Sequence, residues 1–96
     1  MRPVATVGSL GVPHCTPYTI ATGSPNVFVN GLPVATLGSI STPHLMYAKK
    51  CFPHVAAVSF GSTSVFVNGL PIARLGDPLT LCTFIATGSP TVFAGG

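Results

Sequence analysis

The sequence predicts an all-β fold, a small cone of three β-hairpin repeats related by pseudo-threefold symmetry, with little or no helix. A glycine-rich phrase recurs along the chain, and two of its copies place Asn-Gly after a short apolar run. The 11 glycines and 10 prolines are spread over all 96 residues, and no segment repeats apolar residues at the helical period. We expect one domain over 1–96 without an effector extension, because a chain of this length forms a single small core.

Three repeats emerge when the phrases are aligned. The phrase at 23–33 recurs at 61–71, and a third copy that begins at 88 stops at the position equivalent to Gly31. Met1 occupies that same equivalent position at the other end of the chain. The chain therefore begins and ends at one repeat boundary, which favours a closed ring of three units over an open solenoid.

Each repeat is expected to contain one hairpin. Asn-Gly supplies the two positive φ angles of a type I′ turn, so the apolar runs on either side of it are expected to pair as strands. The third hairpin is expected to be cut at its turn, with its two strands at opposite ends of the chain. Proline in the second strand of each pair has no N–H to donate and suits an edge position or a strand start. The expected strands are 26–29 with 33–37, 64–67 with 71–75, and 91–94 with 3–7; helix is expected, if anywhere, only in 45–52.

Residues of metal-ligand type occupy one equivalent position in the three repeats. His14, His44 and Cys82 each stand six residues after the glycine that ends a repeated phrase. In every unit the chain leaves the turn along one strand, reaches the ligand and returns along the next strand. Ligands and turns are therefore expected at opposite ends of the cone. We call the end with these three residues the apex, and the opposite end, with the turns at 30–31 and 68–69 and the two termini, the base.

One zinc ion is the expected occupant of the apex, because zinc binds histidine nitrogen and cysteine sulfur and a structural site takes four ligands. His54 is the expected fourth ligand, since it lies in the longest of the three variable loops, which can fold back over the apex. Cys15 and Cys51 are alternatives for this position, or form buried thiols or a disulfide. Zinc is favoured over iron for a mixed histidine and thiolate site without a redox role.

The composition indicates a surface that meets a partner or an apolar target. Only five residues are charged, Arg2, Lys49, Lys50, Arg74 and Asp77, and the net charge is +3. A soluble domain usually has about a quarter of its residues charged. The four basic residues form no cluster that can follow a phosphate backbone, so we expect no nucleic-acid binding. No signal peptide or membrane-spanning run is expected either.

An enzyme is the poorer hypothesis for this chain. A catalytic zinc keeps an open position and usually has a carboxylate nearby as a base. The only acidic residue is Asp77, which precedes a proline and is expected to form a turn. A nucleophilic pair of Cys82 with a histidine would lack a third group to orient it. The alternative function is a small secreted zinc-dependent hydrolase or effector that uses Cys82 and the histidines.

Together these features resemble the PAAR-repeat proteins, named for a Pro-Ala-Ala-Arg motif, which cap the spikes of type VI secretion systems and contractile phage tails. The segment 71–74 is the best copy of the motif, and 33–36 and 3–6 are degenerate copies. The resemblance covers the whole chain, although the motif is imperfect and two cysteines are additional. It implies a structural zinc near the tip. The implied ligands are His14, His44, His54 and Cys82.

The resemblance also implies a mechanical function. The monomeric cone would cap a trimeric β-helical spike protein, VgrG or a phage spike, sharpen it and help it pierce the target envelope in transient contact with the membrane. Such a protein is made in the cytoplasm and exported or injected at the tip of a contractile apparatus, or forms part of a virion tail. Non-covalent recruitment of effector proteins is a third interpretation. The residues expected to dock on the spike are Asn30, Gly31, Asn68, Gly69, Met1 and Gly96.

Overall fold

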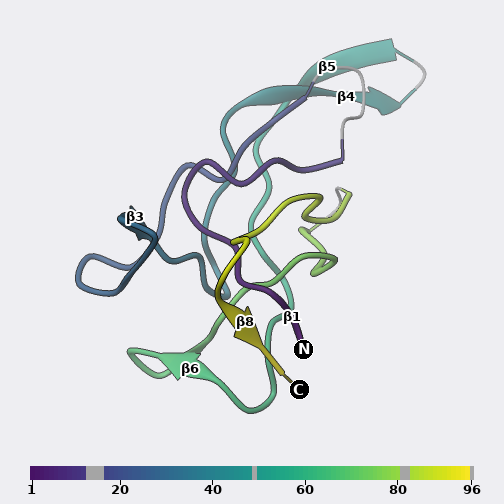
Figure 1. The fold of residues 1–96 in the computed structure, drawn as a ribbon. Helices are drawn as coiled ribbons and strands as arrows, with labels where there is room; N and C mark the ends of the chain where they lie inside the picture. Colours follow the sequence, from purple (N-terminus) through teal and green to yellow (C-terminus); the bar gives the residue numbers. More distant parts are fainter. Residues whose placement is uncertain (13–16, 49, 81–82, 96) are drawn as a thin grey trace.

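The structure, a computed structural model, describes the chain except for residues 13–16, 49, 81–82 and 96, and omits the side chains of 45–53. The described residues form short strands in four two-stranded antiparallel sheets, and they contain no helix. The body is elongated, 38 × 23 × 23 Å (Figure 1). The all-β fold class is confirmed.

Two of the expected hairpins form around Asn-Gly turns. Strand β2 (Phe28–Val29) pairs with β3 (Leu32–Pro33), and β6 (Phe66–Val67) pairs with β7 (Leu70–Pro71). The φ angles are 53° and 79° at residues 30–31, and 53° and 81° at residues 68–69. Both central residues of each turn are thus left-handed, as a type I′ turn requires, and the prediction from Asn-Gly is confirmed.

The third hairpin is assembled from the two ends of the chain. Strand β1 (Arg2–Pro3) pairs antiparallel with β8 (Phe93–Ala94), with Pro3 opposite Phe93. The same register places Pro33 opposite Phe28 in the first hairpin. The expectation of a hairpin cut at its turn is therefore confirmed, and Figure 1 shows the two termini close together at one end of the molecule.

The strands are shorter than the sequence indicates, because each chain segment leaves its own hairpin to join the other units. Beyond Pro33, for example, Val34 forms a β-bridge with Thr6 and Thr36 forms one with Ile72. The long strands expected over 33–37, 71–75 and 3–7 are therefore replaced by two-residue ladders followed by single bridges between units. Proline at the end of each ladder favours this exit, since it donates no ladder hydrogen bond.

Three alanines close the ring at the centre of the molecule. The N–H of Ala5 donates to the carbonyl of Ala73, that of Ala73 to Ala35, and that of Ala35 to Ala5, each at 2.9 Å. All three are 0% exposed. Larger side chains would not fit where three backbones approach one another, and this explains why the second residue after each repeat proline is alanine.

Apolar side chains pack on both sides of this ring in two clusters. The cluster nearer the apex contains the alanines together with Tyr18, Ile20, Ala56, Val58, Leu79 and Ile85. The cluster nearer the base contains Val4, Val34, Val67, Ile72 and Ala94. The base cluster holds residues from all three hairpins, so it connects the split hairpin to the two intact ones.

The longest variable loop forms a fourth hairpin, and the suggestion of helix in 45–52 is wrong. Strand β4 (His44–Ala48) pairs antiparallel with β5 (Lys50–His54). A helix of this length has little stability of its own, and Pro53 directly after it disfavours a helical conformation at the preceding residue, whereas strand pairing satisfies the backbone groups. In Figure 1 this hairpin projects at the end of the molecule opposite the two termini.

Candidate metal centre

His44 and His54 face each other where the β4–β5 hairpin joins the body. They are the first and last residues of the two strands and are directly opposite in the register. Their ring centroids are 4.4 Å apart, with the planes at 73°. The long loop therefore returns His54 to the apex by strand pairing, which is the arrangement that the loop length predicts.

Hydrogen bonding fixes which nitrogen of His44 faces away from the protein backbone. Its Nδ1 lies 2.9 Å from the carbonyl oxygen of Thr42. A carbonyl only accepts, so Nδ1 carries the proton, and in the neutral ring Nε2 holds the lone pair that a metal requires. A backbone carbonyl on the second nitrogen is the usual orienting contact of a metal-binding histidine.

Burial at the same place suits a closed site. His44 is 5% exposed. The Nε2 atom of His54 is also shielded from solvent. A structural metal site is closed to water, so the burial of His44 and of the Nε2 atom of His54 fits structural coordination.

The other expected ligand residues and their alternatives fall outside the part of the chain that the structure describes. His14, Cys15 and Cys82 lie outside the described residues, as does the side chain of Cys51. Among the residues that are described, no group of three or more His, Cys, Asp or Glu side chains forms. The structure thus brings together two of the four expected ligands, His44 and His54.

The residues just before 13–16 and just after 81–82 are nevertheless hydrogen-bonded to each other. The N–H of Val12 donates to the carbonyl of Phe84 at 2.9 Å, and Gly11 forms a β-bridge with Ile85. The hydroxyl of Thr83 donates to the carbonyl of Val12. The segments that enter and leave the positions of His14 and Cys82 therefore run side by side.

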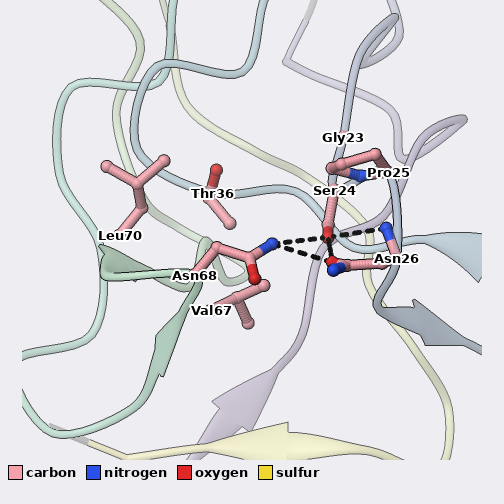
Figure 2. Close-up of a pocket in the computed structure, with 8 residues that line it drawn as sticks. All are labelled: Gly23, Ser24, Pro25, Asn26, Thr36, Val67, Asn68 and Leu70. Carbon is pink, nitrogen blue, oxygen red and sulfur yellow. Dashed lines mark hydrogen bonds between the residues drawn. The ribbon is translucent and has the colours of Figure 1, made fainter.

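At the base, the turn asparagines have a role that the sequence reasoning missed. The side-chain amide of Asn68 donates to Ser24 Oγ at 3.2 Å and to Asn26 Oδ1 at 2.9 Å (Figure 2). Asn30 contacts the corresponding loop of another unit: its side-chain amide donates to Thr91 Oγ1 at 3.0 Å, and its Oδ1 accepts from the hydroxyl of Ser89 at 2.5 Å. Each turn is thus bonded to the loop of a neighbouring unit, beside a groove of about 390 Å³ at Asn68 and one of about 400 Å³ at Asn30.

Asp77 forms the expected turn and also a buried ion pair that the sequence reasoning missed. Its N–H donates to the carbonyl of Arg74 at 3.0 Å. Its carboxylate accepts hydrogen bonds at 3.0 Å from Nε and an Nη of Arg74, and both side chains are 1% exposed. Arg2 adds a second contact at 3.3 Å. The available signal was that the only acidic residue stands three positions after the arginine of the repeat motif.

These features define a class of protein: a small all-β body of three hairpin units, closed into a ring where its chain ends meet. The family model for the PAAR motif matches residues 1–42 and 53–96, and the chain therefore belongs to the PAAR-motif family. The unmatched stretch of 43–52 corresponds to most of the β4–β5 hairpin. A search of the curated proteins finds no match.

The family assignment gives this chain a structural role at a spike tip. PAAR proteins are structural spike-tip proteins of the secreted type VI apparatus and related phage structures. No helix in the described part of the chain is long and apolar enough to cross a membrane.

Proposed function

We propose that this protein caps the blunt end of a trimeric β-helical spike, VgrG or a phage spike, and sharpens it for passage through the target envelope. The observation that carries the proposal is the equivalence of three units around one centre, expressed in the closed ring of hydrogen bonds between Ala5, Ala35 and Ala73. A single chain with this symmetry can present the same surface to each subunit of a trimer, which matches one monomer to one spike.

The chemistry of the base supports docking on a protein. Phe28, Phe66 and Phe93 occupy equivalent positions in the three hairpins and are 56, 54 and 47% exposed. Exposed aromatic residues at equivalent positions are typical of an interface, where they lose contact with water. The docking surface that we propose consists of these phenylalanines and the residues Asn30, Gly31, Asn68, Gly69 and Met1, together with Gly96, which lies outside the described residues.

One structural zinc at the apex is the second part of the proposal, held by His14, His44, His54 and Cys82. The fit is supported by the paired His44 and His54 rings, their burial, and the carbonyl of Thr42 that orients His44. When bound, zinc would supply a cross-link between the three units where the cone is too narrow for a large core. The tip would then be stiff enough to transmit force.

A hydrolase is disfavoured by the position of the single carboxylate. Asp77 is buried in its contacts with Arg74 and Arg2, so it is committed to the ion pair. The chain has no other Asp or Glu that could act as a general base beside the histidines. The proposed function is therefore mechanical.

Docking can be tested by placing charge on the base. We expect the triple substitution of Phe28, Phe66 and Phe93 by Asp to abolish co-elution with the trimeric spike protein from the same system, because a buried unpaired charge opposes the contact. Phe84→Asp is the control, since Phe84 is similarly exposed at 50% but lies near Thr83 at the other end. Co-elution of the triple variant at the wild-type ratio of one chain per trimer would overturn the proposal.

A further inference from the structure

We propose that Tyr18 is a positioning residue for the apex, which holds His44 in place and, through Thr83, ties together the chain segments that lead to the metal ligands. The inference rests on the zinc site proposed above, and it concerns residues other than the four expected ligands. It is carried by contacts among described side chains.

Tyr18 forms a flat wall for the ring of His44. The two ring centroids are 4.2 Å apart and the planes are 19° from parallel. His54 approaches the same imidazole at 73°. Tyr18 is 2% exposed, so its ring is fixed by packing. The Tyr18 ring and the carbonyl of Thr42 together leave His44 little freedom to rotate away from a metal.

The repeat alignment shows that Tyr18 occupies a position where the other two units have small residues. Tyr18, Ala56 and Thr83 each stand two residues before the buried aliphatic residues Ile20, Val58 and Ile85. Their backbones make equivalent bonds, since the carbonyl of each accepts from the N–H of Gly11, Ser41 or Leu79. Three side chains thus point into one narrow region, and one large ring with two small neighbours fills it.

Gly11 provides the space for this ring. A Cβ atom built at Gly11 would lie 2.0 Å from Cζ of Tyr18 and 2.4 Å from its hydroxyl oxygen. No rearrangement of the tyrosine alone would remove that overlap while keeping its stack on His44. The residues at the equivalent positions, Ser41 and Leu79, carry side chains. The apex is therefore shaped around Tyr18 in one unit.

A short chain of hydrogen bonds connects Tyr18 to the third unit and, through it, back to its own unit. Its hydroxyl lies 3.0 Å from Thr83 Oγ1. The Thr83 hydroxyl gives its single proton to the carbonyl of Val12, so Tyr18 must be the donor to Thr83. Val12 directly precedes the segment that contains His14, and Thr83 directly follows Cys82. The Tyr18 side chain thus links the surroundings of His14, His44 and Cys82.

Outer contacts of this kind orient metal ligands, and their removal typically weakens metal binding about 10–100-fold. The test uses the full chain and zinc itself, with transfer of zinc to a chromogenic chelator as the measure of affinity. We expect Tyr18→Phe and Thr83→Val each to weaken zinc binding about 10-fold. The double variant should lose no more than either single one, because both break the same chain of bonds. Tyr18→Leu, which also removes the stack, should lose more.

Cobalt substitution provides a readout that a general loss of stability would not change. Because the d–d absorption bands of bound Co²⁺ report ligand orientation, we expect them to shift in Tyr18→Leu and to keep the wild-type positions in a control at the base. Val67→Ala is that control, since Val67 is buried in the base cluster. Thr80→Val is the matched hydroxyl control: Thr80 donates to the carbonyl of Ala57 at 3.2 Å in an exposed place.

The outcomes separate this inference from the zinc proposal. If wild-type protein binds zinc and all Tyr18 and Thr83 variants stay within about twofold of it, the positioning role is wrong and the zinc site stands. If Val67→Ala weakens binding as much as Tyr18→Phe, the effect follows overall stability and the positioning role is again wrong. If wild-type protein binds no zinc, both proposals fail. Should Tyr18→Phe not fold, Thr83→Val alone decides between these outcomes.

Discussion

The base and the apex of this protein are built in opposite ways. At the base the three units repeat one contact: the N–H groups of Val7, Leu37 and Leu75 donate to the carbonyls of the repeat prolines of neighbouring units at 2.8–2.9 Å. At the apex the equivalent positions hold Tyr18, Ala56 and Thr83, and the three loops differ in length. Equivalent contacts can be repeated where the units are spread apart, but one narrow axis accepts only one large side chain.

The base departs from its symmetry at one place, where the chain ends meet. At two of the three equivalent positions Ser9 and Ser39 accept hydrogen bonds at 3.0 Å from the N–H groups of Thr6 and Thr36. In the third unit Asp77 accepts the equivalent bond from Arg74 at 2.8 Å. The guanidinium of Arg74 also reaches the carbonyl of Gly95 at 2.9 Å, and Arg2 contacts Asp77. Charged side chains thus connect both ends of the chain where a covalent turn is missing.

Removal of the metal should have the largest effect on stability, and it should destabilise the apex more than the base. Structural zinc contributes on the order of 10 kcal/mol in small domains, so we expect prolonged chelation to lower Tm by more than about 15 °C. Calorimetry with elemental analysis before and after chelation measures both quantities. Amide exchange should accelerate more at Gly11, near the apex, than at Val34. An unchanged Tm after complete loss of the metal would show that the apex needs no ion.

The ion pair between Arg74 and Asp77, beside the two chain ends, should have the next largest effect. Asp77→Ala leaves the buried guanidinium of Arg74 without its carboxylate, and we expect a loss of about 3–5 kcal/mol in the free energy of unfolding. Ser39→Ala, at the equivalent position of an intact unit, should lose only about 1 kcal/mol. Urea denaturation measures both. Equal losses at the two positions would contradict the special role of the ion pair beside the chain ends.

A double substitution that copies residues from one unit into another tests the same comparison. The double substitution Arg74→Thr with Asp77→Ser gives the third unit the residues of the first, without a buried charge. We expect it to be more stable than Asp77→Ala, because no unpaired charge is left. It should still unfold at lower urea concentration than wild type, since the bond from Arg74 to Gly95 is lost. If the double variant is less stable than Asp77→Ala, an unpaired buried charge is not the reason that Asp77→Ala loses stability.

The turn amides should show the smallest effect. Asn68→Gly keeps a positive φ available at the turn but removes the bonds to Ser24 and Asn26, which are partly exposed. We expect a loss of about 1 kcal/mol, measured by urea denaturation. Asn30→Gly should give a similar value, because Asn30 also makes two side-chain hydrogen bonds to the loop of a neighbouring unit. A large difference between the two variants would show that the intact hairpins are not interchangeable.

Much of the fold could be predicted because its signals are local. Asn-Gly determines the two intact turns from two residues each, and the repeat boundary at the termini indicates the split hairpin. The pairing of His44 with His54 was reached from loop length, while His14 and Cys82 as ligands stay predictions. The β4–β5 hairpin itself was missed, because a short apolar segment has no period that separates a strand from a helix.

By itself, the sequence determined the number of units, their turns and their closure, since these depend on backbone angles and on a pattern repeated along the chain. Only the tertiary structure decided what happens where the units meet. The buried pair of Arg74 and Asp77, the amides that bridge neighbouring loops, and the single tyrosine at the axis all depend on distances between residues of different units. Those distances are set only when the ring closes, because residues at equivalent positions of different units then meet in the same space.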